Sequence, residues 1–209
     1  MEETHKKLGK GLTLGLVGNS LFVAFSVVCY IYYLVYKPNN AFSKFLEITA
    51  YTLEFSGFVS LIVSDILISR TARMRDWLKT AFSVYIVAEA VMMILELNSY
   101  RLDFYKPYSL ALAIIHSVFS AVVCFSFLTL DPDKKQFEVI VIICIGIILG
   151  GMMGNVIGIR VYFSIFTNNI SFVVLFGAIK FLLKREVIEI DCYGDKATVT
   201  EYKSTFFEE

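Results

Sequence analysis

The chain has 209 residues, of which 57% are hydrophobic and 18% are charged, whereas soluble domains carry about 25% charged residues. A soluble fold of this size cannot bury so much apolar surface. The composition therefore excludes a soluble domain and indicates a membrane protein. The 19 Lys and Arg residues balance the 19 Asp and Glu residues, and this neutral total gives no reason to expect a nucleic-acid partner.

Six segments of the chain are apolar over the length that a membrane helix needs. A helix crosses a hydrocarbon core about 30 Å thick with about 20 residues. Residues 1–185 therefore predict an all-α integral membrane domain, a bundle of six transmembrane helices embedded in the lipid bilayer. In chain order the segments are 12–36, 48–69, 78–97, 107–130, 138–158 and 162–183.

The basic residues near the segment ends predict the orientation, because cytoplasmic loops are richer in Lys and Arg. The larger group lies on the side that holds both ends of the chain. We therefore expect a multi-pass protein of the plasma (inner) membrane with both termini cytoplasmic. The cations on this side are Lys6, Lys7, Lys10, Arg70, Arg73, Arg75, Lys79, Lys134, Lys135, Lys180, Lys184 and Arg185, and those on the other side are Lys37, Lys44, Arg101, Lys106 and Arg160.

The tail, residues 186–209, differs in character from the helical domain. Apolar and polar residues alternate on both sides of Gly194 and Asp195, a pattern typical of a two-residue β-hairpin. Two strands alone are marginal in water, so the predicted cytoplasmic hairpin would dock on this protein's inner surface, on a second subunit or on a partner. The alternative is a frayed tail without strands.

Five ionisable residues stand out within the predicted helices, where each costs roughly 2.5–3.5 kcal/mol at mid-membrane. The topology predicts Glu54 in the outer half of the membrane, Asp65 near the inner end, Glu89 and His116 close to the midplane, and Glu96 near the outer boundary. The first four would form a series of protonatable groups, as a proton-coupled carrier requires. Alternatively, Asp65 and Glu96 lie among the lipid headgroups, and Glu54 and Glu89 are neutral acids that bond neighbouring helices.

Neutral amides add hydrogen-bonding groups to the same helices. Asn168 and Asn169 are adjacent in the last segment, so their side chains point to two faces of one helix. Buried amides commonly join membrane helices by hydrogen bonds. The pair is therefore a candidate either for helix packing or for the lining of a solute site.

The segment 138–158 contains a glycine every fourth residue. Such a stripe lets another helix approach closely, in a membrane where lipid offers no hydrophobic drive for association. Its partner would be the first helix, which also carries spaced glycines, or a second copy of the same helix in a homodimer; a further alternative is a sliding or hinge surface. The stripe comprises Gly146, Gly150, Gly154 and Gly158, and the first helix has Gly11, Gly15 and Gly18.

The loop 70–79 is densely cationic. Its position on the predicted cytoplasmic side explains this charge without a further role. Binding of anionic lipid or of a cytosolic protein is the alternative, and the tail is a second candidate for such a protein contact.

Common enzyme signatures are absent, and the four cysteines have no metal-type spacing. We therefore expect no metal or cofactor and favour a protein that is not an enzyme. The first hypothesis is a small transporter or channel for a small solute or cation, coupled to protons. The alternatives are a sensor or accessory subunit that signals to a cytosolic partner, and an intramembrane enzyme acting on lipid with the acidic residues and His116 as acid and base.

Overall fold

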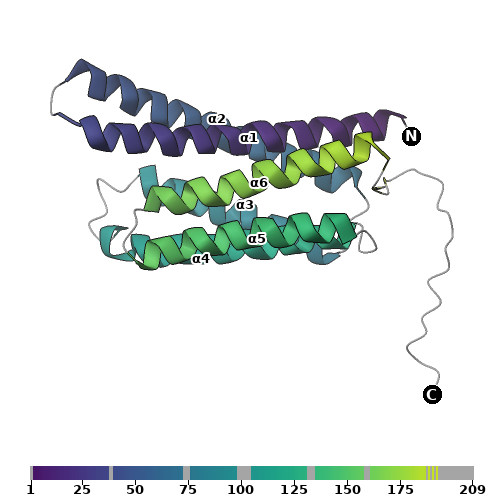
Figure 1. Ribbon diagram of the computed structural model, residues 1–209. Coiled ribbons are helices and arrows are strands. Elements are labelled where there is room, and N and C mark those ends of the chain that lie inside the picture. Colours follow the sequence, from purple (N-terminus) through teal and green to yellow (C-terminus); the bar gives the residue numbers. More distant parts are fainter. Residues whose placement is uncertain are drawn as a thin grey trace.

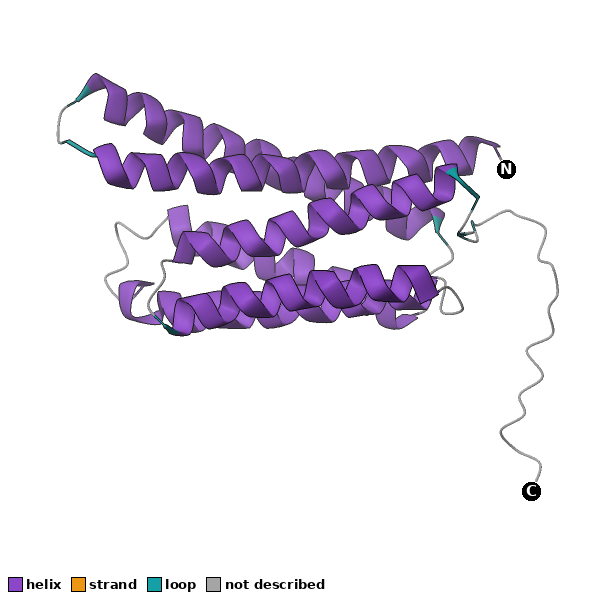
Figure 2. Cartoon of the chain, viewed as in Figure 1, coloured by secondary structure: helices purple, strands orange, loops and turns teal. Residues whose placement is uncertain are grey.

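The computed structural model describes residues 2–37, 40–72, 76–97, 105–130, 135–157 and 161–186, together with positions 188, 190 and 192. Regular structure in this part of the chain is entirely helical (Figure 2). Each of the six predicted segments falls on a helix. In chain order these are α1 (Glu2–Val35), α2 (Ala41–Thr71), α3 (Asp76–Leu97), α4 (Tyr105–Ser126) followed by the 3-10 helix η1 (Phe127–Leu130), α5 (Lys135–Val156) and α6 (Val161–Lys184).

Four of these helices, α1, α2, α5 and α6, are long and apolar enough to cross a membrane. The described parts of α3 and α4 contain shorter apolar stretches, Lys79–Ala88 and Ala113–Ser126. The class of membrane protein is thereby supported, while six crossings stay a prediction. With 34 residues, α1 is about 51 Å long at about 1.5 Å per residue.

The helices pack in three layers (Figure 1). The antiparallel pair α1 and α2 forms one layer, α6 and α3 lie in the middle, and α4 and α5 form the opposite layer. The central position of α6 follows from its contacts with α1, α4 and α5. Accordingly Phe172, Leu175, Phe176 and Ile179 on α6 are buried in the main apolar core.

Glycines on α1 allow close contact with its neighbours. A Cβ added at Gly15 would lie 2.7 Å from a ring atom of Phe176 on α6 and 2.8 Å from the Ser64 hydroxyl on α2. That hydroxyl donates a hydrogen bond of 2.7 Å to the carbonyl of Gly11. The glycines of the first helix therefore pack on α2 and α6 and not on α5, which removes one of the two partners considered for the glycine stripe.

The glycine stripe of α5 faces open space over part of its length. A Cβ at Gly146 or at Gly150 would meet nothing within 4 Å, whereas Gly154 is buried. The close contact on α5 is made instead by Gly151, where an added Cβ would clash with Thr167 on α6. Gly158 lies outside the described residues. At Gly146 and Gly150 the stripe thus has no partner within the described chain.

Many hydroxyl side chains within the described helices donate to their own backbone. Bonds to the carbonyl one turn earlier remove the cost of an unpaired polar group in an apolar setting. The donors with such bonds are Thr13, Ser20, Ser26, Thr49, Thr52, Thr71, Ser83, Ser126 and Ser171. A serine that bonds elsewhere, such as Ser64, therefore marks a contact between helices.

The start of the tail packs against the ends of α1 and α2. Ile188, Ile190 and Cys192 are all buried. Cys192 forms an isolated antiparallel bridge with Ala72 at the end of α2, so this part of the tail lies against the protein's own helices. No strand occurs in the part of the tail that the structure describes, and the predicted turn at Gly194 and Asp195 lies outside it.

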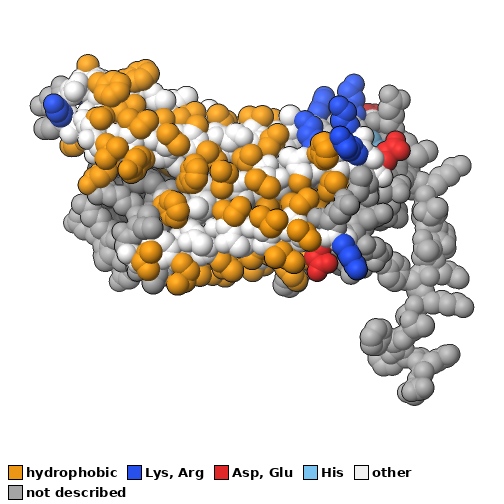
Figure 3. Space-filling model, in the orientation of Figure 1, with side chains coloured by type: hydrophobic (Ala, Val, Ile, Leu, Met, Phe, Trp, Pro, Cys, Tyr) orange, Lys and Arg blue, Asp and Glu red, His pale blue; other side chains and the backbone are white. Residues whose placement is uncertain are grey.

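The surface has an apolar middle and charged ends (Figure 3). Large hydrophobic side chains are exposed along the helices, for example Phe55 at 60% and Ile142 at 56%. Lys and Arg side chains gather at the end that holds the N-terminus and the start of the tail. At this end the Lys180 ammonium donates a hydrogen bond of 2.8 Å to the Thr13 hydroxyl. This distribution suits a protein surrounded by lipid.

Candidate functional site

Polar side chains of α4 and α6 meet inside the apolar bundle. The amide Nδ2 of Asn168 lies 3.1 Å from Nδ1 of His116 and donates a hydrogen bond of 3.2 Å to the Ser117 hydroxyl. All three residues are buried, and Asn168 and Ser117 are fully inaccessible. Because an amide nitrogen only donates, His116 Nδ1 is the acceptor when the amide has this orientation.

An aromatic residue of α3 covers the imidazole. The Tyr85 ring stacks on the His116 ring with a centroid distance of 5.9 Å and an interplanar angle of 28°. Tyr85 also packs against Phe172 of α6 at 5.6 Å. Three helices thus fix the position of His116, which favours a single orientation of its ring.

Two polar atoms close to this site lack a hydrogen-bond partner within the described chain. They are the carbonyl Oδ1 of Asn168 and the hydroxyl of Ser120, one turn beyond His116 on α4. Leaving a buried acceptor or donor unpaired costs about 1–3 kcal/mol, so such a site favours a water, a proton carrier or a polar solute. We define the His116 site as Tyr85, His116, Ser117, Ser120 and Asn168.

The Asn168 amide can serve either protonation state of His116. If it turns by half a rotation, Oδ1 takes the place of Nδ2 and accepts from a protonated Nδ1 and from the Ser117 hydroxyl. The geometry around the amide is otherwise unchanged, because O and N occupy equivalent positions on the group. The site therefore has hydrogen bonds for a neutral imidazole and for a charged one.

Both carboxylic residues of α2 lie on its buried face. Glu54 and Asp65 are each 5% exposed, in agreement with a spacing that returns to one side of a helix. The relative depths of residues on α2 and α6 can be compared from Gly15 on α1, because Ser64 of α2 and Phe176 of α6 both lie beside it. From that level Asn168 is about 12 Å along α6 and Glu54 about 15 Å along α2 in the same direction. The structure thus places Glu54 at a depth similar to that of His116, and Asp65 close to the level of Gly15.

Two further predicted residues, Asn169 and Glu89, lie on helices that contribute to the His116 site. Asn169 donates to the carbonyl of Ile165 in its own helix at 2.8 Å, so this bond does not join helices. Glu89 lies one turn along α3 from Tyr85, but its side chain is outside the described part, so the predicted pair of Glu89 and His116 stays a prediction. Within the described residues, no group of His, Cys, Asp and Glu is arranged to hold a metal.

Tyr85, Ser117 and Ser120 were not predicted as site residues from the sequence. The two serines carried a usable signal, because with His116 they form polar positions one residue and one turn apart on an otherwise apolar helix. Tyr85 gave no such sequence signal, because a single tyrosine in an apolar helix is usually a core residue. Which residues of α3 and α6 would face that part of α4 depends on helix packing, which periodicity does not give.

The fold and the site define a helical membrane protein with a buried polar site between three helices. Comparison with protein-family models, with curated proteins and with solved structures finds no match to this chain. Its function therefore has to be inferred from the site itself.

Proposed function

We propose that this chain is a small transporter or channel for a small solute or cation, coupled to proton movement through His116. The observation that supports this proposal is the bond between Asn168 and His116, which is buried among apolar helices. A histidine at this depth is costly unless it has a task, and imidazole changes charge near neutral pH.

The proposed mechanism uses the two arrangements of the Asn168 amide. With His116 neutral, the amide nitrogen of Asn168 donates to Nδ1, and its carbonyl Oδ1 faces the region where it has no hydrogen-bond partner within the described chain. With His116 protonated, the amide turns and presents its NH₂ group to that region instead. The groups that a solute meets therefore change from acceptor to donor as the proton arrives, which couples solute binding to protonation.

The acidic residues complete the proposed pathway. Glu54 and Asp65 lie on one buried face of α2, about 16 Å apart along the helix. Asp65 would serve as the inner access group, and Glu54, at about the depth of His116, would deliver protons to it from the outer side. We assign Glu89 to the central step beside His116, with Asn168 and Asn169 lining the route. Both termini are cytoplasmic in this proposal, and the membrane is the plasma (inner) membrane.

Proton flux into liposomes tests the proposal. Purified protein is reconstituted with a pH-sensitive dye inside the vesicles, and candidate solutes and cations are added on one side. We expect His116→Gln to abolish the pH-dependent signal and Glu54→Gln to reduce it. His5→Gln provides the matched control, since the chain has only two histidines and His5 lies on the exposed end of α1. Equal flux in the two histidine variants contradicts the proposal.

A second candidate function, a sensor or accessory subunit, is favoured by the packing of the tail. The backbone of Cys192 forms an isolated β-bridge with Ala72, which directly precedes residues 73–75 of the cationic loop 70–79. The Cys192 thiol lies 3.8 Å from Nδ1 of His5. A movement of α1 or α2 would therefore reach the tail directly. Co-purification of a cytosolic protein that disappears on deletion of residues 193–209 would favour this function over transport.

A homodimer through α5 is part of the same proposal. Gly146 and Gly150 have open space beside them, so a second copy of α5 has room to approach. Cysteines placed at these two positions should form crosslinks between copies in native membranes. A cysteine at Phe163, exposed on α6, serves as the control and should not crosslink.

A further inference from the structure

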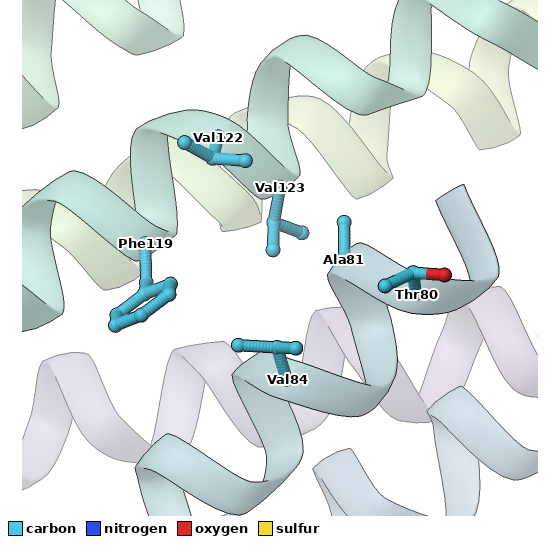
Figure 4. Close-up of a pocket in the computed structure, with 6 residues that line it drawn as sticks. All are labelled: Thr80, Ala81, Val84, Phe119, Val122 and Val123. Atoms are coloured by element: carbon cyan, nitrogen blue, oxygen red, sulfur yellow. The ribbon is translucent and has the colours of Figure 1, made fainter. Parts of the chain in front are cut away.

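An apolar groove runs between α3 and α4 on the surface of the bundle (Figure 4). It is lined by Thr80, Ala81 and Val84 on α3 and by Phe119, Val122 and Val123 on α4. The cavity has a volume of about 160 Å³. Val84 and Val122 are 41% and 37% exposed, so the groove opens toward the surroundings of the protein.

The groove adjoins a cationic end of the molecule. Thr80 lies in the second turn of α3 and follows Lys79 directly. In sequence, the segment 70–79 carries four basic residues against one acidic residue, Asp76, and Arg70 is exposed at the end of α2. A molecule seated in the groove therefore has an apolar wall along its length and positive charge at one end.

This combination corresponds to one class of molecule. A surface groove without charged side chains suits a hydrocarbon chain, and a cation at the membrane boundary attracts an anionic headgroup. We propose that the groove between α3 and α4 is a binding site for an anionic phospholipid, whose acyl chain lies along Val84 and Val122 and whose phosphate lies near Lys79. This site is separate from the His116 site and does not depend on the proposed transport.

The single tryptophan of the chain, Trp77, provides a reporter, because it precedes Thr80 by less than one turn of α3. Brominated acyl chains quench tryptophan fluorescence on contact. Protein is reconstituted in phosphatidylcholine vesicles that contain increasing fractions of brominated phosphatidylglycerol or of brominated phosphatidylcholine. We expect the anionic lipid to reach half-maximal quenching at a fraction about fivefold lower, which is the effect of one cation near an anionic membrane surface.

Two variants test the cationic end and the apolar groove separately, and a third variant is the control. Lys79→Gln should remove the preference for the anionic lipid, and Ala81→Phe should fill the groove and reduce quenching by both lipids. Val87→Phe is the matched control, because Val87 is exposed on α3 but does not line the groove. Equal quenching by the two lipids in the unaltered protein overturns the proposal, as does unchanged quenching in both Lys79→Gln and Ala81→Phe. If Ala81→Phe does not fold, the Lys79→Gln comparison decides.

Discussion

Asn168 on α6 and His116 on α4 are joined across 3.1 Å by the amide Nδ2 of one and Nδ1 of the other. This bond is the one described link between an ionisable side chain and a neutral amide in the interior of the described bundle. Its partners lie in two different apolar helices, so neither is explained by the local structure of its own helix.

Asn168→Leu should destabilise the protein by about 1–3 kcal/mol, because the change leaves His116 Nδ1 and the Ser117 hydroxyl without their donor. Asn169→Leu is the control and should cost less, since that amide bonds only to its own helix. Thermal unfolding in detergent, followed by helical circular dichroism, measures both. In a double-mutant cycle, combination with His116→Leu should show a coupling of about 0.5–3 kcal/mol; strictly additive effects would mean that the two residues do not interact.

Glycine-to-alanine substitutions should have opposite effects on α1 and α5. Gly15→Ala places a methyl group 2.7 Å from the Phe176 ring, and overpacking of this kind costs about 1–3 kcal/mol. Gly146→Ala meets nothing within 4 Å and should be neutral or stabilise the monomer by up to about 1 kcal/mol through helix propensity. Thermal unfolding at low protein concentration separates the two variants. A stable Gly15→Ala protein would contradict the close packing of α1 on α6.

Ile190→Asp should release the start of the tail. Ile190 is 3% exposed within the main apolar core, and a carboxylate there would lose its hydration. The Cys192 thiol, fully buried in the native protein, should then react rapidly with a maleimide, as peptide mass spectrometry can locate. Glu186→Asp, at an exposed position, is the control and should leave Cys192 protected. Equal labelling of Cys192 in the two variants would show that the tail does not pack as described.

Accessibility labelling tests the predicted topology. With both termini inside, a cysteine in place of Lys44 should react with an impermeant maleimide added to intact cells, and one in place of Lys7 should react only after the membrane is opened. Both lysines are exposed, so burial does not explain a difference between them. Labelling of Lys7→Cys from outside would reverse the predicted orientation.

Helix positions followed from the sequence because hydropathy depends on each segment separately. The same holds for the burial of Glu54 and Asp65 on one face of α2, which residue spacing along a single helix predicts. Contacts between helices did not follow in this way. The glycine spacing of α5 identified a helix face without side chains, but it did not identify what packs on that face. The close contact with Thr167 is made by Gly151, which lies beside the stripe.

Partners of the polar residues were the hardest to predict. Asn168 was recognised as a residue that packs helices or lines a site, yet its bond to Ser117 depends on how α4 and α6 are aligned. The tail illustrates the same difficulty, because its alternating pattern predicts an extended segment but does not identify Ala72 as the residue it pairs with. Patterns along one segment specify its conformation, whereas pairing is a property of two segments.

The length of α1 has a consequence for where this protein resides. The apolar part of α1, residues 12–35, is about 36 Å long at about 1.5 Å per residue. This exceeds an ordinary hydrocarbon core of about 30 Å, and a mismatch of this kind is relieved by tilting or by local thickening of the lipid. Each ångström of mismatch costs a fraction of a kilocalorie per mole, which is enough to sort proteins between compartments. Between two bilayers of unequal depth, the hairpin of α1 and α2 would therefore partition into the deeper one.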